Sequence, residues 1–245
     1  MKPCFDGKTV LVTGAGWGIG AAIALRYAAY GAKVVVSDTS RKGGKDIVDR
    51  IKSQKGAATY IRTDVSNVAA CEKLIKSTIE TYGSIDIACN NSSVFGELMR
   101  LTKEEMEAFD MEVSLSTIGL NNCMQAEIKA MQKHGGGIIV NTSSIIGAIG
   151  LASLRRYLIA KYGMTSLPQN PSGEYPAGKG IHINTVAPAF INTALSKATV
   201  QKEKEDRTKS LPEGRSGIIQ EVAGLILWLS SAESHLLPTV PDHNN

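Results

Sequence analysis

Short apolar segments alternate with longer amphipathic segments along most of the 245-residue chain. The short segments are rich in valine and isoleucine and mostly continuously apolar, as in parallel strands covered on both faces. They predict strands at residues 9–13, 33–37, 58–62, 85–89, 137–142 and 181–186. The amphipathic segments predict helices at residues 19–30, 44–53, 69–82, 103–133 and 153–167. This alternation predicts right-handed βαβ units and an α/β fold with a doubly wound parallel β-sheet flanked by helices.

The chain shows no internal repeat, low-complexity segment or linker, so residues 1–245 are expected to form a single domain. Pro168 and Pro171 should end the last of these helices early, because proline lacks the N–H that a helix needs. The C-terminal tail contains Pro238 and Pro241 and is too interrupted for a central strand. A closing strand is therefore doubtful.

Composition narrows the function classes. Charges of both signs are mixed and the net charge is only +4, which favours a solvated surface over a nucleic-acid-binding patch. No segment approaches about 18 consecutive apolar residues, and the N-terminus has no apolar signal region. A cytoplasmic protein that does not enter membranes is expected. The cysteines form no CxxC pair and should be reduced thiols rather than disulfides or metal ligands: Cys4, Cys71, Cys89 and Cys123.

A glycine-rich segment, TGAGWGIG at residues 13–20, lies between the first expected strand and the first expected helix. Glycines permit positive φ and a close approach to a pyrophosphate, and the helix N-terminus offers free N–H groups. Gly16, Gly18 and Ala21 satisfy a GxGxxA pattern, while Gly14, Gly18 and Gly20 satisfy GxxxGxG. Both patterns predict a dinucleotide-binding loop.

Asp38 closes the second expected strand, twenty residues after Gly18. A carboxylate there can accept hydrogen bonds from the adenosine ribose, and it would repel a 2′-phosphate. NAD is therefore favoured over NADP, and the non-basic Trp17 inside the loop agrees. Arg41 and Lys42 could approach a phosphate, which keeps NADP possible, although solvent exposure at a helix start is the preferred interpretation.

Tyr157 and Lys161 are four residues apart in an expected helix and should share one face. A cation beside a phenol lowers the phenol pKa from about 10 toward neutral. Such a tyrosine suits proton transfer in alcohol–carbonyl chemistry. Tyr175 and Lys179 have the same spacing, but Pro176 disfavours a helix there. The pattern predicts a catalytic pair only at the first position.

Together these residues resemble the short-chain dehydrogenase/reductase family over residues 8 to about 230. The glycine loop is similar to the family's TGxxxGxG motif, and Asn90–Asn91 to the start of its NNAG element. Ser144 precedes Tyr157 by thirteen residues, the interval of the family's catalytic serine. Further matches are Asp64, Val65, Pro188, Ile191, Thr193, Gly214-Arg215 and a helix at Glu221-Val222-Ala223. The resemblance implies a single Rossmann-like domain and nicotinamide-dependent oxidoreduction of a small-molecule alcohol or carbonyl substrate.

The resemblance also implies roles. Tyr157 would donate a proton to a carbonyl oxygen as hydride arrives, or accept it in oxidation. Lys161 would lower the tyrosine pKa and hold the nicotinamide ribose, and Ser144 would stabilise charge on the same substrate oxygen. The implied cofactor-binding residues are Thr13, Gly14, Trp17, Gly18, Ile19, Gly20, Asp38, Asp64, Val65, Asn90, Asn91, Tyr157, Lys161, Pro188, Ile191 and Thr193.

The chain departs from the family pattern at several positions. By spacing, Ser114 stands where the family has a fourth catalytic residue, an asparagine that helps hold a proton-relaying water. Asn121 and Asn122 lie about two turns further on and should not replace it. Ser92-Ser93 replaces Ala-Gly of NNAG, and Ala189 replaces a glycine. These changes motivate an alternative function, a binding or regulatory protein of this fold with weak or no catalysis.

Two further expectations concern neighbours of the site. Pro168 and Pro171 fall in the helix that usually pairs subunits of the family, which weakens the implied homodimer or homotetramer. The substrate pocket should involve residues 94–99, 145–154 and 190–199. Arg155 and Arg156 could meet an anionic substrate, but exposure or a subunit contact is the preferred interpretation.

Overall fold

The computed structural model describes residues 5–93, 106–145, 154–169, 180–191 and 214–234. These residues contain one six-stranded sheet of order β3-β2-β1-β4-β5-β6, and all five strand pairings are parallel. The strands are β1 (Thr9–Thr13), β2 (Lys33–Asp38), β3 (Ala57–Arg62), β4 (Ile87–Asn90), β5 (Gly137–Thr142) and β6 (Ile181–Val186). The chain starts in the middle of the sheet, runs out to β3, and returns to β4, so the strand order reverses between β1 and β4.

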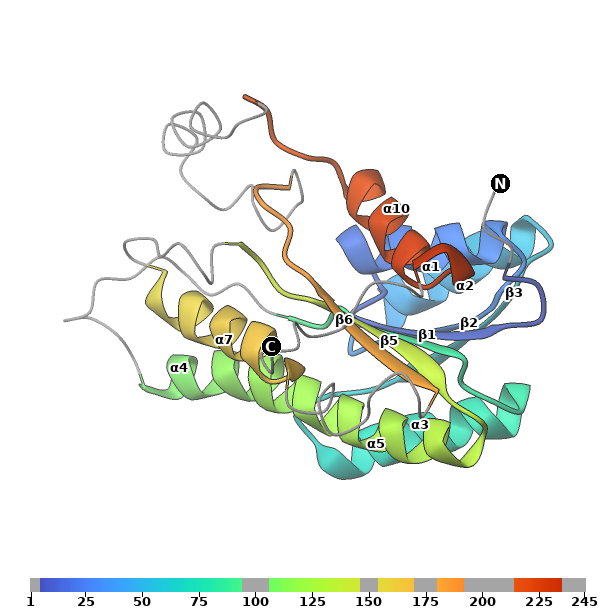
Figure 1. Cartoon of the computed structure of the whole chain (residues 1–245), viewed down its shortest axis with the longest axis horizontal. Coiled ribbons are helices and arrows are strands. Elements are labelled where there is room, and N and C mark those ends of the chain that lie inside the picture. The colour runs from blue at the N-terminus through green and yellow to red at the C-terminus, as the bar shows by residue number, and fades with distance from the viewer. Residues whose placement is uncertain (1–4, 94–105, 146–153, 170–179, 192–213, 235–245) are drawn as a thin grey trace, which may run out of the picture.

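Helices cover both faces of this sheet (Figure 1). On one face lie α1 (Gly18–Ala29), α2 (Arg41–Ser53) and α10 (Ile219–Leu229), the last followed by the short turn η5 (Ala232–Ser234). The other face carries α3 (Val68–Tyr82), α4 (Met106–Val113), the π-helical turn η2 (Ser114–Ile118), α5 (Gly119–Lys133) and α7 (Arg155–Ser166). The expected Rossmann-like, doubly wound α/β fold is confirmed.

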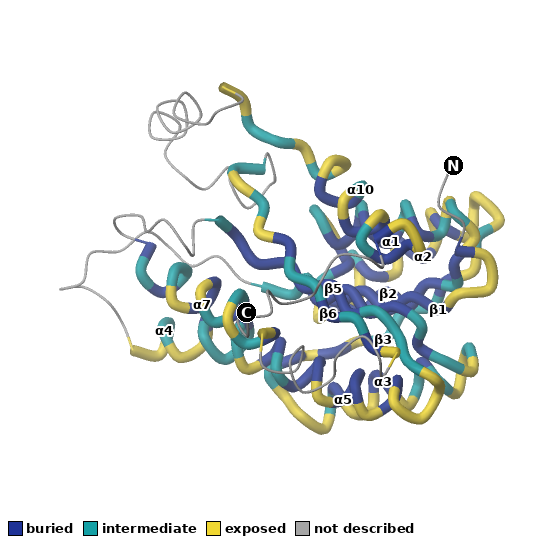
Figure 2. The backbone as a smooth tube through the Cα atoms, viewed as in Figure 1, coloured by how far each residue is buried: buried dark blue, intermediate teal, exposed yellow. Residues whose placement is uncertain are grey.

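The central strands are buried on both faces, as Figure 2 shows by their dark blue tubes. Successive side chains of a strand point to opposite faces. Val10 and Val12 therefore pack under α1 and α10, while Leu11 between them packs toward α3 and α5. This two-sided burial explains why the strands are continuously apolar in the sequence.

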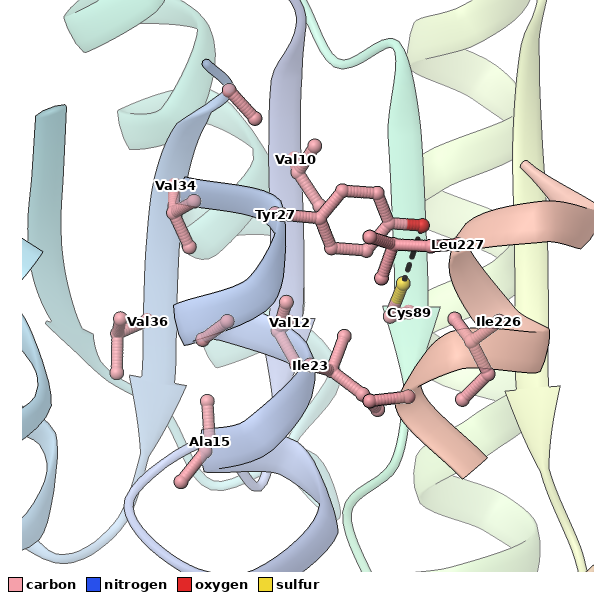
Figure 3. Packing of buried hydrophobic residues seen from close by; sticks show 14 of the residues in the cluster. Val10, Val12, Ala15, Ile23, Tyr27, Val34, Val36, Cys89, Ile226 and Leu227 are labelled. Atoms are coloured by element: carbon pink, nitrogen blue, oxygen red, sulfur yellow. Dashed lines mark hydrogen bonds between the residues drawn. The ribbon is translucent and has the colours of Figure 1, made fainter. Parts of the chain in front are cut away.

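Tyr27 joins α1 to α10 and to the sheet. Its ring is fully buried beside Val10, Ile23 and Leu227 (Figure 3). Its hydroxyl donates to Ser230 Oγ at 2.7 Å, immediately after α10. Burial raises the pKa of Tyr27 well above its ordinary value, so the hydroxyl stays a neutral donor. The helix that follows the glycine loop is thereby fixed against both the sheet and α10.

The structure reproduces the expected strands closely: β1, β5 and β6 have the expected bounds, and the other three differ by one or two residues. Helix α2 begins earlier than expected because Ser40 Oγ accepts a hydrogen bond from the Gly43 N–H and caps it. The helix expected over residues 103–133 contains a π-helical turn. Helix α7 ends at Ser166, as Pro168 predicts. Pro171 and the C-terminal tail lie outside the described residues.

Within the described ranges, no helix has both the length and the apolar character that a membrane crossing needs. Three of the four cysteines are described, and all three are free, buried thiols: Cys71, Cys89 and Cys123.

Candidate active site

The expected site residues gather at one edge of the sheet, because parallel strands end on the same side. Thr13 ends β1, Asp38 ends β2 and Asn90 ends β4. Ser144 follows β5 and Pro188 follows β6. The reversal of strand order between β1 and β4 lies at this edge, where open α/β sheets bind their ligands.

The glycine loop has the backbone that a phosphate site requires. Gly14 and Gly18 have φ of +62° and +60°, which favours glycine. A Cβ on Gly20 would collide with the carbonyl oxygen of Gly14. Trp17 precedes α1 without capping it, so its side chain leaves the N–H groups of the first turn, Ile19 among them, for an anion.

Thr13 and Asn91 hold this loop against the end of β4. Thr13 Oγ1 accepts from the N–H groups of Asn91 and Ser92 at 3.1 and 3.2 Å. The Asn91 side chain donates to the Gly14 carbonyl oxygen at 3.3 Å. Both residues therefore shape the cofactor edge through the backbone of the loop.

Asp38 is fixed over the same loop. Its Oδ2 accepts from the Gly16 N–H at 2.9 Å, and its Oδ1 accepts from the Ser40 N–H at 2.8 Å. Each carboxylate oxygen keeps a second lone pair for a further donor. Arg41 and Lys42 lie in the first turn of α2 with exposed side chains, as expected.

Asp64 and Val65 form the turn after β3. Asp64 is exposed, and its Oδ1 accepts from the N–H and hydroxyl of Ser66 at 3.0 and 2.7 Å. Val65 is buried, and its carbonyl oxygen accepts from the Asn122 side chain at 3.0 Å. Asn122 thus supports this turn, in line with the expectation that it does not replace the family's asparagine.

The three expected catalytic side chains lie together between β5 and α7. Ser144 and Tyr157 are hydrogen-bonded to one another, and Ser144 Oγ also donates to the Pro188 carbonyl oxygen at 3.4 Å. Lys161 Nζ lies 5.5 Å from the centroid of the Tyr157 ring. It donates to the carbonyl oxygen of Thr142 at 3.4 Å.

The expected lowering of the Tyr157 pKa by Lys161 is wrong in this structure. Burial raises the Tyr157 pKa, and the nearby carboxylate of Glu112 raises it further, against the lowering effect of the Ser144 hydrogen bond. Lys161 Nζ lies over the Tyr157 ring and donates to the Thr142 carbonyl oxygen. Burial lowers the pKa of Lys161 itself to about 8, while Glu112 acts in the opposite direction.

Ser143, which the sequence analysis passed over, fastens α7 to β5. Its Oγ donates to the Lys161 carbonyl oxygen at 2.8 Å and lies 2.7 Å from Thr165 Oγ1. This holds the helix of Tyr157 and Lys161 in register with the strand that carries Ser144. The sequence signal for this role is the pair Ser143-Ser144 directly after an apolar strand.

Glu112 is a second residue that sequence reasoning missed. It forms a buried ion pair with Arg156, with Oε2 and Nε 3.6 Å apart and side chains 2% and 6% exposed. Of the two preferred expectations for Arg156, exposure or a subunit contact, exposure is therefore wrong: its side chain is buried where α4 and α7 meet. Arg155 is half-buried.

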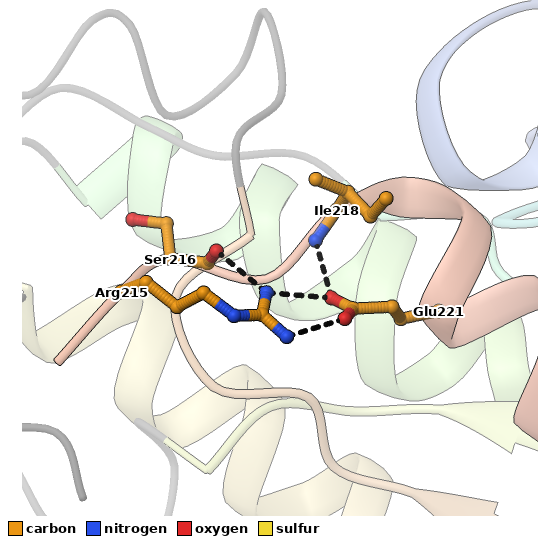
Figure 4. Close-up of polar contacts among 4 residues, drawn as sticks. All are labelled: Arg215, Ser216, Ile218 and Glu221. Carbon is orange, nitrogen blue, oxygen red and sulfur yellow. Dashed lines mark hydrogen bonds and ion pairs between the residues drawn. The ribbon is translucent and has the colours of Figure 1, made fainter. Parts of the chain in front are cut away.

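The segment that follows β6 contacts the segment that precedes α10. Ile191 pairs with Gly217, whose N–H donates to the Phe190 carbonyl oxygen at 2.8 Å. Glu221 binds the guanidinium of Arg215 through both oxygens, at 2.6 and 3.1 Å, and accepts from the Ile218 N–H at 2.9 Å (Figure 4). Arg215 holds the pKa of Glu221 at about 2. Thr193 lies outside the described residues.

Comparison with known proteins identifies the family to which the chain belongs. A family model described as enoyl-(acyl carrier protein) reductase matches residues 14–237. Cyclohexanol dehydrogenase of Acinetobacter sp. (strain SE19) is 34% identical over 234 residues, covering 96% of this chain and 92% of the relative. The chain belongs to the short-chain dehydrogenase/reductase family. It is an oxidoreductase of that family, since its relatives are dehydrogenases and reductases.

Other members of the short-chain dehydrogenase/reductase family agree. The 3-oxoacyl-[acyl-carrier-protein] reductase FabG of Escherichia coli (strain K12) is 34% identical over 233 residues, covering 94% of this chain and 92% of the relative. The solved structure of levodione reductase superposes with a TM-score of 0.90 at 30% identity, covering 96% of this chain and 95% of that one. A 7α-hydroxysteroid dehydrogenase solved with NADH and 7-oxo glycochenodeoxycholic acid has a TM-score of 0.90 at 29% identity, over 96% and 92% of the two chains.

The position where spacing predicts the family's fourth catalytic residue falls at the start of the π-helical turn. Ser114 is its first residue and is half-buried. A π-turn shifts the following side chains around the helix axis. Ser116 is buried with its Oγ 3.3 Å from Ser93 Oγ, and Thr117 Oγ1 donates to the Ala160 carbonyl oxygen at 3.1 Å. Hydroxyl groups of this turn therefore contact both the end of β4 and the residue before Lys161.

Proposed function

We propose that this protein interconverts a secondary alcohol and a ketone or other carbonyl by NAD(P)(H)-dependent hydride transfer, with Tyr157 as general acid and base. One observation carries the proposal. Tyr157 is hydrogen-bonded to Ser144 and lies beside Lys161, at the sheet edge that also carries the glycine loop and Asp38.

The residues of the edge fit a nicotinamide dinucleotide. The open space beside Gly18 and the first-turn N–H groups of α1 suit a pyrophosphate. Asp38, held by two backbone N–H groups, suits ribose hydroxyls and disfavours a 2′-phosphate. NAD is proposed as the preferred cofactor, which the NADH complex of the steroid dehydrogenase relative supports. The exposed Arg41 and Lys42 keep NADP a second candidate.

The chain's own groups handle the proton. The bound nicotinamide supplies or accepts the hydride. In reduction, the Tyr157 hydroxyl donates its proton to the carbonyl oxygen, and in oxidation the phenolate accepts it. Ser144 donates a hydrogen bond to the same oxygen and stabilises its developing charge. Lys161, whose pKa is lowered to about 8, can take up or release a proton near the working pH.

The substrate is proposed to be a small-molecule alcohol or carbonyl compound. Relatives are named for cyclohexanol and for 3-oxoacyl groups on a carrier protein, and one was solved with a 7-oxo steroid acid. The compounds in these names have in common a carbonyl or hydroxyl group on carbon, but their carbon skeletons differ. Residues 94–99, most of 145–154 and most of 190–199 lie outside the described residues.

A homodimer or homotetramer is proposed as the assembly. Helices α4 and α7 present large apolar side chains to solvent: Met111 is 59%, Ile159 45% and Tyr162 63% exposed. A second copy of the chain would bury them. The cytoplasm stays the location that the sequence predicts.

Replacing Tyr157 with phenylalanine tests the mechanism. The proposed acid and base is lost while the ring is kept, so turnover should fall by about 10²–10⁴-fold and cofactor affinity should change little. The assay follows the absorbance of reduced nicotinamide over a panel of alcohols and ketones with NAD and NADP. Tyr162→Phe is the matched control, because Tyr162 lies on the same helix and is exposed. Turnover in Tyr157→Phe equal to that of the control would overturn the mechanism.

A further inference from the structure

A buried polar cluster lies directly behind the cofactor edge. Asn90, at the end of β4, donates from Nδ2 to Glu127 Oε2 at 2.9 Å and to Asn141 Oδ1 at 3.1 Å. Glu127 belongs to α5 and Asn141 to β5. Glu127 and Asn141 are 0% exposed and Asn90 is 3% exposed. Asn90 precedes Asn91, which holds the glycine loop, and Asn141 lies three residues before Ser144.

The two hydrogen-bonded side chains each have one oxygen left over. Both hydrogens of Asn90 Nδ2 are used, which fixes the orientation of the amide. Asn90 Oδ1 and Glu127 Oε1 are both buried and accept no hydrogen bond from any described residue. Leaving a buried acceptor unsatisfied is costly. Here two unsatisfied oxygens occur on two side chains that are hydrogen-bonded to each other, so one hydrogen atom shared between these oxygens would satisfy both.

The surroundings of Glu127 do not suit a carboxylate. Among the described residues it forms no ion pair. The titratable groups near it are thiols, Cys89 of β4, Cys71 of α3 and Cys123 of α5, and β5 contributes the neutral Asn141. An ionised Glu127 would be a buried charge without a counter-charge there, which proteins avoid by keeping the group neutral.

We propose that Glu127 is protonated in the working enzyme and donates its carboxyl O–H to Asn90 Oδ1. With the existing bond from Asn90 Nδ2, this makes a cyclic pair of a carboxylic acid and an amide, and one proton satisfies both leftover oxygens. Glu127 is then a positioning residue for the cofactor edge, acting through Asn90. This last role rests on the proposed function, whereas the protonation does not.

The proton makes the edge sensitive to pH. Burial raises the pKa of Glu127 from 4.5 to about 7, opposed by the hydrogen bond from Asn90. Because the folded pKa is higher than the unfolded one, the contribution of Glu127 to stability is fully present below about pH 4.5. It is lost as pH rises to about 7, where the folded state also releases the proton. Cys89, with its pKa raised to about 12, stays neutral throughout.

Two variants distinguish the effect of the Glu127 proton from the effect of the Glu127 side chain as a whole. Glu127→Gln replaces the O–H donor with an N–H donor and forms the same paired hydrogen bonds at every pH. Glu127→Ala removes both bonds. Glu72→Gln is the matched control, because Glu72 is an exposed glutamate on α3.

The first measurement is urea unfolding of the protein without cofactor between pH 4.5 and 8.5. Relative to Glu127→Gln, the folding equilibrium constant of the wild type should fall by about 150-fold between pH 4.5 and 8.5, from the difference of about 2.5 between the folded and unfolded pKa values. The Glu72→Gln control should follow the wild type. A ¹³C NMR titration of the glutamate carboxyl groups measures the protonation of Glu127 directly. It needs only the wild-type protein, so it remains possible if a variant fails to fold. Parallel stability profiles of wild type and Glu127→Gln, or no glutamate titrating well above pH 4.5, would overturn the proposal.

The second measurement is the Kd for NADH across the same pH range. The wild type should bind less tightly above about pH 7, Glu127→Gln should show no such step, and Glu127→Ala should bind weakly throughout. A step shared by wild type and Glu127→Gln contradicts the positioning role. If NADH and NADPH both fail to bind the wild type, the proposed function fails, while the unfolding and NMR measurements still decide the protonation.

Discussion

The buried pair of Glu112 and Arg156 gives a sharp prediction for stability. Replacing Arg156 with methionine keeps much of the side-chain volume and leaves the Glu112 carboxylate, 2% exposed, without the partner 3.6 Å away. Removing one member of a buried ion pair costs about 3–5 kcal/mol. Native proteins are stable by only about 5–15 kcal/mol, so this is a large fraction of the total. For a chain of this length the midpoint of thermal unfolding should fall by roughly 6–20 °C.

The assay is urea unfolding followed by far-ultraviolet circular dichroism and by tryptophan fluorescence, with coincident transitions required before a free energy is taken. Glu112→Leu with Arg156→Met is the decisive companion, because it removes both charges. The double variant should be more stable than Arg156→Met alone.

An exposed pair supplies the control. Lys76 and Glu80 are 3.8 Å apart on α3 with side chains 77% and 62% exposed. Lys76→Met should therefore cost less than about 1 kcal/mol. The reasoning is refuted if Arg156→Met costs no more than Lys76→Met, or if the double variant is less stable than Arg156→Met.

Three further predictions concern the cofactor edge. Gly20→Ala should abolish dinucleotide binding because its Cβ collides with the Gly14 carbonyl oxygen, whereas Gly224→Ala, whose Cβ meets only the end of the Arg26 side chain at 3.2 Å, should bind normally in a fluorescence titration of NADH. Asp38→Asn should lower the preference for NAD over NADP by roughly tenfold or more, about 1.4 kcal/mol, in the ratio of the two kcat/KM values. Ser143→Ala should cost about 1–3 kcal/mol in urea unfolding, since the hydroxyl bonds the Lys161 carbonyl oxygen at 2.8 Å. Normal NADH binding by Gly20→Ala would contradict the first prediction. An unchanged ratio of the kcat/KM values for NAD and NADP in Asp38→Asn would contradict the second, and unchanged stability of Ser143→Ala would contradict the third.

The sequence predicted the sheet well because its strands are apolar on both faces. Periodicity was less informative about helix starts. Helix α2 begins with Arg41, Lys42 and two glycines, which carry no apolar pattern, so only the Ser40 cap marks its start. The π-helical turn at Ser114–Ile118 was also invisible, since its five residues read as ordinary helix.

The site was predicted where local motifs define it and missed where distant segments meet. The glycine loop and the spacing of Ser144, Tyr157 and Lys161 are short-range patterns that the fold brings together. Glu112 and Glu127 read as ordinary helix-surface glutamates, and only packing shows that they are buried. The raised pKa of Tyr157 was missed for the same reason, because burial depends on neighbours that spacing does not reveal.

The contact of Tyr27 with α10 has a consequence for how the protein is made. Tyr27 and Ser230 are 203 residues apart, yet Ile226 and Leu227 complete the core over the first strand and helix. Ribosomes add about 5–20 residues per second, so about 10–40 s separate the synthesis of these partners. During that interval the glycine-loop helix exposes the apolar face that α10 will cover. The nascent chain therefore keeps apolar surface of the kind that chaperones bind exposed until α10 has been made.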